Sequence, residues 1–526
     1  MPSPLVRVVS AKESADRDRA AIDRGTPSQV LMDRAGTGAA DEILRRYREQ
    51  LRDGATVYTG PGNNGGDGWV VAGRLAREGV KVTVVEAVAA KSPDAITWKK
   101  AAVDSVTVAD SARDGVGVVI DALLGTGSEG DPRGKIADGI AGINQMRSNG
   151  ARVAALDIPS GLDATTGTHS SCVVADVTLS FGSAKRGSLL ARDCCGEIVV
   201  LDIGLDANTG SNSDGLPVLV DGEWVRSHIP PIRYDAHKGS RKHLAIVGGG
   251  RGMPGAVVLA SRAALRSGIG LVRTLVAPGN VGVVLEAAPS ALISEWPVNQ
   301  REISAEISKW ADAIVIGPGL GKSKETRELV EKILGDSKLP VLLDADALNV
   351  FEGDTEALTK LLAGRAALIT PHVAEFARLA GLNVEKVLSN RFDVGIELAS
   401  AIGATVLLKG SPTVIFTPAG DRFVVARGTA ALGTGGSGDI LSGIAGTLLA
   451  QMADAAVPLP ASPVPLPPSP VAASCAAWVH GRAAELCERI RGTTLEDVLY
   501  ALPRAWNEVE PPTVPPVLAR IPAVAR

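Results

Sequence analysis

The chain contains 526 residues, of which 45% are hydrophobic and 21% are charged, with 59 Gly and 32 Pro. This globular composition excludes wholesale disorder, because the apolar side chains are numerous enough to fill large cores. The net charge of −4 provides no basic surface for nucleic acid or for an anionic membrane. At roughly 150 residues per domain, the length predicts two large α/β domains or three smaller ones.

The five cysteines are an odd number, and none of them forms a CxxC pair. They therefore indicate a reducing compartment rather than a disulfide framework or a zinc site. The N-terminal segment is charged and has no apolar core, so no secretory signal is expected. We expect a cytoplasmic α/β protein that forms a homo-oligomer and binds neither nucleic acid nor membranes.

Short apolar runs alternate with helical segments before residue 206. The predicted strands are ATVYTG, KVTVVEA, VGVVIDALLG, ARVAALDI, ADVTLSFG and GEIVVLDIG, and helices are predicted over 68–78 and 135–148. Continuous apolar strands separated by helices indicate a parallel sheet that is covered on both faces. Residues 205–238 interrupt the alternation, so we predict domains at 1–214 and 215–526.

The first glycine-rich segment, GPGNNGGDG (60–68), follows the strand ATVYTG and precedes a helix predicted to begin near Trp69. Glycine and asparagine permit positive φ angles, and backbone N–H groups at a helix start bind anions such as a pyrophosphate. The spacing differs from the dinucleotide-binding fingerprint, which disfavours an ordinary Rossmann oxidoreductase.

Two later strands of this half also end in polar residues. Asp121 ends one strand and is followed by a second glycine loop (125–131), and Asp157 and Ser160 follow the next strand. The carboxyl ends of parallel strands share one edge, where ligands bind. Asn64, Asp121 and Ser160 offer only oxygen ligands, which suit a monovalent ion at least as well as Mg²⁺. Each aspartate taken alone is better explained by a turn or a helix cap, but the three strand-end motifs taken together favour a ligand site.

With DRAAIDRGTPSQVLMDRAG and FGSAKRG (181–187), these motifs resemble the YjeF N-terminal family over about residues 5–206. The resemblance implies a Rossmann-like three-layer αβα domain that epimerises hydrated NADH and NADPH, with Asp157 as acid and base. It implies that K⁺ is held by Asn64, Asp121 and Ser160. The implied substrate contacts are Asn63, Asn64, Gly65, Gly66, Asp67, Gly125, Thr126, Gly127, Ser128, Glu129, Gly130, Asp131 and Asp157. Some relatives are binding modules without catalysis, but the intact motifs favour an enzyme.

The alternation restarts with HLAIVGGG and continues through GLVRTLVAP, ADAIVIGPG, LPVLLDADA, AALITPH, ATVLLKG and TVIFTP. GTGGSGD (433–439) then precedes the helical segment ILSGIAGTLLA. Its glycines let the backbone surround phosphate oxygens, and Asp439 is placed to accept a proton from an attacking hydroxyl. The other interpretation is a tight turn in which Asp439 caps the helix.

Further polar residues follow other predicted strands of this half. They include Lys409 and Thr413 around a turn, His372 after Pro371, and Asp344, Asp346 and Asn349 in LLDADALNV. Residues 248–270 form a loop and a helix that could close over a substrate through Ala256. The stretch 457–470 contains seven prolines and is predicted to be an extended or disordered surface insertion outside the core.

This half resembles the ribokinase-like superfamily over about residues 236–505, which implies a second three-layer αβα domain. His372, KGSPT and GPGLG point to its NAD(P)H-hydrate dehydratase branch rather than to a vitamin or sugar kinase. The resemblance implies hydrate contacts from Ala256, Gly319, His372 and Asp439. It implies nucleotide contacts from Lys409, Gly410, Ser411, Pro412, Thr413 and Gly438. Mg²⁺ is expected, with either ADP or ATP as phosphoryl donor.

Two domains that resemble consecutive steps support each other. We therefore expect a bifunctional enzyme that epimerises the R and S hydrates, NADHX and NADPHX, and dehydrates the S form. The alternatives are a kinase of a small hydroxymethyl heterocycle with a regulatory first half, and a scaffold fused to a degenerate kinase.

Overall fold

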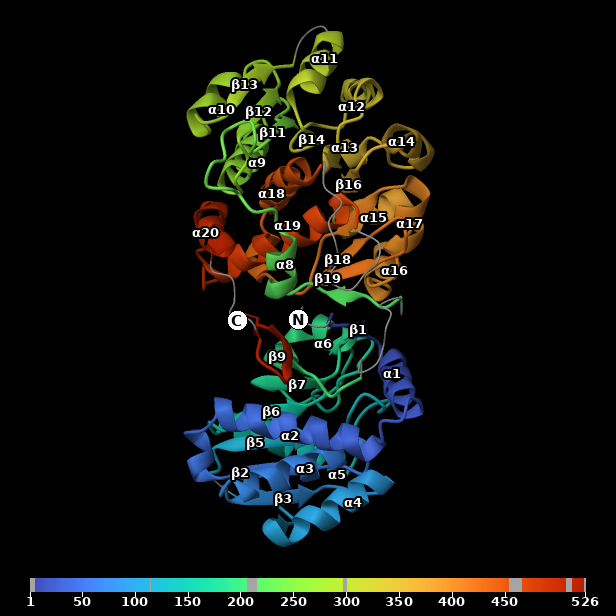
Figure 1. Cartoon of the computed structure of the whole chain (residues 1–526), viewed down its shortest axis with the longest axis vertical. Helices are drawn as coiled ribbons and strands as arrows, with labels where there is room; N and C mark the ends of the chain where they lie inside the picture. The colour runs from blue at the N-terminus through green and yellow to red at the C-terminus, as the bar shows by residue number, and fades with distance from the viewer. Residues whose placement is uncertain are drawn as a thin grey trace. The chain divides into compact units, whose positions relative to one another are not determined.

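The computed structural model describes residues 5–113, 115–205, 215–296, 300–453, 466–507 and 513–524 (Figure 1). The contacts divide the chain into two compact units. Unit 1 comprises Met1–Gly210 and Pro512–Val524, and unit 2 comprises Ser211–Pro511 and Ala525–Arg526. Each unit is built around its own sheet, as predicted for an α/β protein with two sheets.

Unit 1 contains an eight-stranded sheet in the order β20-β9-β7-β6-β5-β2-β3-β4. All neighbouring pairs are parallel except β20 and β9. The strands are β2 (Ala55–Thr59), β3 (Val82–Glu86), β4 (Thr107–Ala109), β5 (Val118–Ala122), β6 (Arg152–Leu156), β7 (Val177–Phe181), β9 (Glu197–Leu201) and β20 (Val517–Ile521). A separate parallel pair joins β1 (Val8–Val9) to β8 (Ala184–Lys185).

Helices cover both faces of this sheet. The helices are α1 (Ala11–Asp23), α2 (Ser28–Arg46), α3 (Asn63–Arg77), α4 (Pro93–Ala102), α5 (Lys135–Ser148), α6 (Arg186–Leu190) and α7 (Arg192–Cys195). Val57 and Ile120 belong to a core with Trp69 of α3, whereas the alternate positions, such as Tyr58, pack with Ile140 of α5. Strand side chains alternate between faces, so the all-buried strands place the sheet between two helical layers.

The predicted division of the chain is wrong for the C-terminal strand β20, which belongs to unit 1. The sequence placed every residue from 215 onward in the second domain, but β20 pairs antiparallel with β9 of unit 1. Arg520 of this strand donates from Nη1 and Nη2 to the carboxylate of Glu42, at 2.9 and 3.2 Å. It also donates to Glu197 at 3.2 Å. A fragment that ends near residue 215 therefore lacks an edge strand of its own sheet.

We predict that Arg520→Met lowers the stability of unit 1 by about 1.5–3 kcal/mol, the range for hydrogen bonds to charged groups. Burial alone would raise the pKa of Glu42, but hydrogen bonds from Arg45, Arg520 and Arg46 lower it to about 2. A depressed carboxylate pKa stabilises the fold above the unfolded pKa, and this contribution is lost as the pH falls from about 4.5 towards 2. Thermal unfolding at pH 7 and at pH 3 measures both effects.

Arg45→Met is the matched control, because Arg45 also binds Glu42 but its side chain is 60% exposed. Exposed ion pairs contribute about 0–1 kcal/mol. Equal losses from the two variants at pH 7 would contradict a special role for the C-terminal strand.

Unit 2 contains a ten-stranded sheet in the order β10-β19-β18-β17-β16-β15-β14-β11-β12-β13. The pairs β17–β18 and β18–β19 are antiparallel, and the others are parallel. The strands are β10 (Val218–Leu219), β11 (His243–Val247), β12 (Leu271–Val276), β13 (Leu292–Glu295), β14 (Ala313–Ile316), β15 (Val341–Leu343), β16 (Ala367–Ile369), β17 (Thr405–Leu408), β18 (Thr413–Phe416) and β19 (Arg422–Val425).

The helices of unit 2 form two layers around the sheet (Figure 1). The first layer contains α9 (Pro254–Arg266), α18 (Ser437–Met452), α19 (Pro468–Glu485) and α20 (Leu495–Asn507). The second contains α11 (Gln300–Trp310), α12 (Lys324–Asp336), α14 (Thr355–Leu362) and α17 (Gly395–Ile402). The other α-helices of the described residues in unit 2 are α8 (Gly222–His228), α10 (Val281–Ala287), α13 (Asp346–Asn349), α15 (Val373–Ala380) and α16 (Val384–Ser389).

The end of the proline-rich stretch belongs to the core, contrary to the prediction. Residues 454–465 lie outside the described parts of the chain, but Leu466 is buried and α19 begins at Pro468 with Ser469 and Pro470 buried. Proline is tolerated in the first turn of a helix, because its missing N–H would have no partner there. The last prolines thus start a buried helix instead of ending a surface loop.

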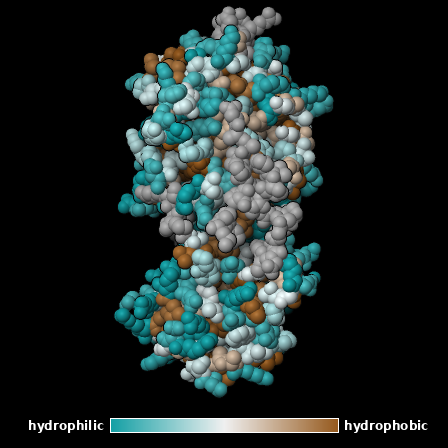
Figure 2. Space-filling view, in the orientation of Figure 1, coloured by the Kyte–Doolittle hydropathy of each residue, from teal (hydrophilic) through white to brown (hydrophobic). Residues whose placement is uncertain are grey.

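On the face shown in Figure 2, hydrophilic residues predominate and hydrophobic ones are scattered among them. Such scattered apolar residues are ordinary on a protein surface. Among the described residues, none of the helices is both long and apolar enough to span a bilayer.

Candidate functional site

The first glycine-rich segment starts a helix earlier than predicted and for a different reason. Helix α3 begins at Asn63 rather than near Trp69, and none of the glycines from 60 to 68 has a positive φ. All of them except Gly62 permit close packing instead. A Cβ at Gly60 would lie 1.8 Å from the Leu123 carbonyl oxygen, and one at Gly65 would lie 2.1 Å from the Gly60 oxygen. The backbone at the start of α3 therefore packs closely against the residues that follow β5.

The three predicted cation ligands come together at this edge. Asn64 donates from Nδ2 to the Leu124 carbonyl at 2.8 Å, and the Leu124 N–H donates to Ser160 Oγ at 2.8 Å. Ser160 Oγ donates to Asp121 Oδ1 at 2.6 Å, and the Ser160 N–H donates to Oδ2 at 2.8 Å. The structure thus joins residues from α3, β5 and the loop after β6.

Two features of this cluster suit a cation. The Asn64 Oδ1 atom is buried and has no hydrogen-bond partner within the described chain. Asp121 is fully buried, and burial raises its pKa to about 6 despite hydrogen bonds from Ser160 and Leu123. A nearby positive charge would stabilise the ionised carboxylate and satisfy the unpaired amide oxygen.

Asp157 lies at the end of β6 and faces a buried lysine. Its Oδ1 atom accepts from the ammonium of Lys185, whose side chain is 0% exposed, and from the Phe181 N–H at 3.0 Å. Lys185 also donates to the carbonyls of Phe181 at 2.9 Å and Ser183 at 3.2 Å. Asp157 has a φ of +62°, a conformation that is uncommon for non-glycine residues, although aspartate adopts it more readily than most.

Two further carboxyl groups share this environment. Burial, and then the negative charge of Asp157, raises the pKa of Asp67 well above its ordinary value. Asp18 of α1 has a pKa raised to about 6, mainly by burial. Asp18 and Lys185 were missed as site residues, although FGSAKRG, which contains the lysine, was recognised as a family motif. The site thus combines three acidic groups, Asp18, Asp67 and Asp157, with the buried Lys185.

The second glycine loop is only partly at this edge. Gly125 lies beside Asn64, because a Cβ on Gly125 would be 3.2 Å from the Asn64 Cβ. Glu129, Gly130 and Asp131 are exposed, and Asp131 Oδ1 accepts from Ser170 Oγ at 2.6 Å. Whether the loop contacts a substrate stays a prediction.

In unit 2, helix α18 begins at Ser437 after Gly436, whose φ of +98° requires glycine. Asp439 lies in the first turn and is partly buried. Burial, and then the negative charge of Asp344, raises the pKa of Asp439 to about 7. A carboxylate at this pKa can act as a general base near neutral pH.

Lys409 joins the same edge through an ion pair. Its Nζ donates to Asp344 Oδ1 at 2.9 Å and lies 3.8 Å from Glu375 Oε2. Ser442 of α18 donates to the other Asp344 oxygen at 2.7 Å. Burial alone would lower the pKa of Lys409, but Asp344 and Glu375 raise it, so the lysine stays charged. A Cβ on Gly438 would be 3.3 Å from this Nζ, which places Lys409 directly at the start of α18.

His372 serves as the N-cap of α15. Its Nδ1 accepts from the N–H groups of Ala374 and Glu375 at 3.1 and 3.4 Å, and Glu375 Oε2 accepts from the His372 N–H at 2.8 Å. This capping box gives His372 a structural role at the start of α15. Its side chain is 52% exposed, so the outer face of the ring can still contact a ligand.

The other predicted dehydratase residues form two groups. Ala256 and Gly319 are neighbours, because a Cβ on Gly319 would lie 3.0 Å from the Ala256 Cβ. Gly410 to Thr413 form the turn between β17 and β18, where Thr413 Oγ1 donates to the Gly410 carbonyl at 3.0 Å. Arg391 supports this turn by donating to the Pro412 carbonyl at 3.2 Å. His480 of α19, which sequence reasoning missed, lies 3.4 Å from Ser437 Oγ.

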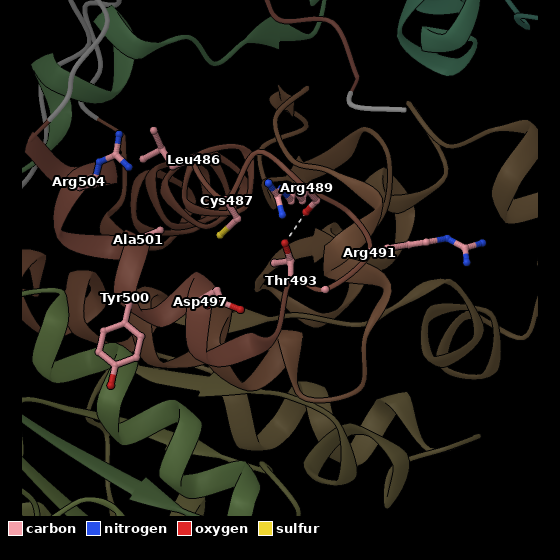
Figure 3. Close-up of a pocket in the computed structure, with 10 residues that line it drawn as sticks. Leu486, Cys487, Arg489, Arg491, Thr493, Asp497, Tyr500, Ala501 and Arg504 are labelled. Atoms are coloured by element: carbon pink, nitrogen blue, oxygen red, sulfur yellow. Dashed lines mark hydrogen bonds between the residues drawn. The ribbon is translucent and has the colours of Figure 1, made fainter.

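A surface hollow of about 420 Å³ lies between α19 and α20 and contains none of the predicted site residues. Arg489, Thr493, Asp497 and Tyr500 are among the residues that line it, and Figure 3 shows the Arg491 side chain pointing away from them. The catalytic candidates instead lie at the ends of the parallel strands, as expected for α/β sheets.

Comparisons with known proteins cover both units. The NAD(P)H-hydrate dehydratase family model matches residues 244–504, and that of the YjeF-related protein N-terminus matches residues 28–187. The bifunctional NAD(P)H-hydrate repair enzyme Nnr of Moorella thermoacetica is 32% identical and covers 96% of this chain and 97% of its own. Its counterpart in Escherichia coli is 35% identical and covers 91% and 89%. A crystal structure of the Bacillus subtilis ADP/ATP-dependent NAD(P)H-hydrate dehydratase, 28% identical with a TM-score of 0.46, covers 55% of this chain and 97% of its own.

Proposed function

The chain belongs to the family of bifunctional NAD(P)H-hydrate repair enzymes, and from that membership we propose which residues carry its two reactions. Its substrates carry a water molecule added across the C5–C6 double bond of the nicotinamide ring. One activity interconverts the R and S epimers at C6, and the other dehydrates the S form. The observation that carries the residue assignment is a lysine near each candidate base. Asp157 accepts from Lys185, and the Lys409 Nζ lies at the start of α18, the helix that carries Asp439.

For epimerisation, we assign proton transfer to Asp157. The lone pair of the ring nitrogen expels the C6 hydroxyl as water when a proton is supplied, which leaves an iminium ion. Water then adds to either face of C6 and returns a proton to the carboxylate. Lys185 holds the Asp157 oxygen in place, and we assign binding of the substrate phosphates to the N-terminus of α3.

We propose that Asn64, Asp121 and Ser160 hold K⁺ in unit 1. The buried, unpaired Asn64 Oδ1 and the fully buried Asp121 carboxylate fit a cation with oxygen ligands. Such an ion would supply fixed positive charge at the strand edge that faces the substrate. The segment Leu123 to Gly125 contacts all three ligands. A bound ion would therefore also fix the backbone at the start of the second glycine loop.

We predict that Asp121→Asn raises the K⁺ concentration needed for half-maximal epimerisation by at least about tenfold. The change keeps the shape of the side chain but removes the only carboxylate among the proposed ligands. A titration of epimerase rate against K⁺ at constant ionic strength measures this. Asp138→Asn, an exposed aspartate in the first turn of α5 that belongs to none of the proposed sites, is the matched control. An unchanged K⁺ dependence in Asp121→Asn would remove this residue from the cation site.

For dehydration, we assign the general base to Asp439. It takes the proton of the C6 hydroxyl while that oxygen attacks the terminal phosphorus of ADP or ATP. The C6–O bond then breaks with phosphate as leaving group, driven by the ring nitrogen, and loss of a C5 proton restores the dihydropyridine. Lys409 and the N–H groups at the start of α18 stabilise the transferring phosphoryl group.

The acidic residues of this edge fit a divalent cation. Burial is the main cause of the raised pKa of Asp439, and the negative charges of Asp344 and Asp346 add to it. Mg²⁺ bound with the nucleotide would neutralise phosphate charge. Asp346 Oδ2 also accepts from the Gly321 N–H at 2.8 Å, which orients it toward the loop after β14.

Incubation of the protein with chemically prepared hydrates and ADP or ATP tests the assignment. We expect free phosphate and the reappearance of the NADH absorbance in equal amounts. A stable phosphorylated product without free phosphate would instead indicate a kinase. Separate reactions with ADP and with ATP identify the donor.

A further inference from the structure

Unit 1 contains a cluster of His169, Cys172 and Cys194 that the proposed reactions do not use. One ligand atom from each residue lies within 4.8 Å of the other two. Cys172 Sγ is 2.9 Å from Cys194 Sγ, and Cys194 Sγ is 3.7 Å from His169 Nε2. Both cysteines are buried, whereas the histidine is exposed. The cluster therefore has a buried thiol side and a solvent side.

The orientation of His169 is that of a metal ligand. Its Nδ1 atom lies 3.3 Å from the Gly167 carbonyl oxygen, so the N–H belongs on Nδ1 and the lone pair on Nε2. Metal-binding histidines commonly donate their second ring N–H to a backbone carbonyl in this way. Here the lone pair faces the sulfur of Cys194. A disulfide between the two cysteines would leave this arrangement unexplained.

We propose that His169, Cys172 and Cys194 bind a thiophilic divalent cation such as Zn²⁺, with the fourth position open to solvent. Two thiolates on a tetrahedral zinc, each bonded at about 2.3 Å, lie roughly 3.8 Å apart. Binding therefore requires the two sulfurs to separate by about 0.9 Å from their present 2.9 Å, a small side-chain rotation. Both thiols lose their protons to solvent on binding.

This proposal reverses the sequence-based expectation of no zinc site. That expectation rested on the absence of CxxC, but the ligands come from the segment before β7 and from α7, which the fold brings together. The same segment supports the proposed cation site, because the Val173 N–H donates to the Ser160 carbonyl at 3.0 Å. A metal here would hold the backbone next to Ser160 in place.

The test uses the full-length protein, reduced and freed of metal with a chelator, and Co²⁺ as a spectroscopic probe. We expect one Co²⁺ per chain, with a sulfur-to-cobalt charge-transfer band that Zn²⁺ abolishes by displacement. Cys172→Ser, Cys194→Ser and His169→Ala should each weaken binding more than the 10–100-fold typical of losing an outer-shell partner. Thermal unfolding of the wild type should shift upward with Zn²⁺.

Cys195→Ser is the matched control, because Cys195 is adjacent to Cys194 but its Sγ donates to the Ala191 carbonyl at 3.4 Å. Cys487→Ser controls for a thiol in unit 2. No charge-transfer band in the wild type, or an undiminished band in Cys172→Ser, would overturn the proposal. Loss of two thiols on treatment with peroxide, without any metal uptake beforehand, would show a disulfide-forming pair instead. These readouts do not depend on epimerase activity.

Discussion

Replacement of Asp439 by asparagine should lower the rate of dehydration of the S hydrate by about 10²–10⁴-fold, the usual contribution of a general base. Asparagine keeps the size of the side chain and its place in the first turn of α18, but it cannot take the hydroxyl proton. Phosphate release from hydrate and nucleotide measures the loss. Nucleotide should still bind, because backbone N–H groups and Lys409 remain in place.

Two internal controls separate chemistry from folding. Epimerisation should be unchanged in Asp439→Asn, because Asp157 belongs to unit 1. Asp421→Asn, an exposed aspartate that accepts from Thr417 in the turn before β19, should leave dehydration unchanged. Near-normal phosphate release by Asp439→Asn would remove this residue from the mechanism, and loss of both activities would indicate damage to the fold.

The raised pKa of Asp439 also predicts how dehydration depends on pH. Burial and the charge of Asp344 place this pKa at about 7, and the basic form is the active one. The rate in wild type should therefore rise with pH through about 7 and then level off. Between about pH 4 and 7, Asp439 is protonated in the folded protein but ionised in the unfolded chain. The folded state is therefore progressively destabilised relative to the unfolded state as the pH rises from about 4 to 7. Asp439→Asn should thus unfold at a higher temperature than wild type at pH 8.

Much of the fold could be predicted from local sequence. The runs ATVYTG, KVTVVEA and VGVVIDALLG became β2, β3 and β5, since continuous apolar segments between helices indicate buried parallel strands. The strand β20 could not be found in this way. Its partner β9 ends more than three hundred residues earlier, and nothing in a short C-terminal run specifies so distant a pairing. Such pairings depend on the completed fold rather than on local pattern.

The candidate sites were predicted where a motif follows a strand and missed where it does not. The expectation that Asn64, Asp121 and Ser160 lie close together rested on the shared edge of parallel strands, and hydrogen bonds join them there. Lys185 lies in a two-residue strand, 28 residues from Asp157, so no local pattern marks it as a partner. Asp18 lies on α1, and the sequence does not indicate which face of this helix packs against the site.

The physical role of residues was harder to predict than their location. The glycines of 60–68 were expected to supply positive φ angles, but none of them has one, and Gly60 instead permits close contact with the Leu123 carbonyl oxygen. Conversely, the unusual φ of +62° falls on Asp157, where the sequence gives no glycine to signal it. Backbone strain at an aspartate is expected only where the surrounding structure enforces it.

The last prediction follows from that strain and from the buried ion pair. Asp157→Asn should reduce epimerisation by about 10²–10⁴-fold, because the amide cannot exchange a proton with water at C6. Asparagine is the suitable replacement, since it tolerates positive φ better than alanine does and its Oδ1 can still accept from the Phe181 N–H. Exchange between the R and S hydrates, followed by chromatography, measures the rate, and dehydration serves as the internal control.

The variant should also be less stable, and this effect can be separated from the loss of chemistry. Lys185 is 0% exposed and keeps two carbonyl acceptors, Phe181 and Ser183, but loses its counter-charge. Removing one partner of a buried pair costs up to about 3–5 kcal/mol, and removing both often costs less. The double variant Asp157→Asn/Lys185→Met should therefore regain thermal stability while epimerisation stays absent. Recovery of epimerisation along with stability would show that Asp157 only balances the charge of Lys185 and transfers no proton.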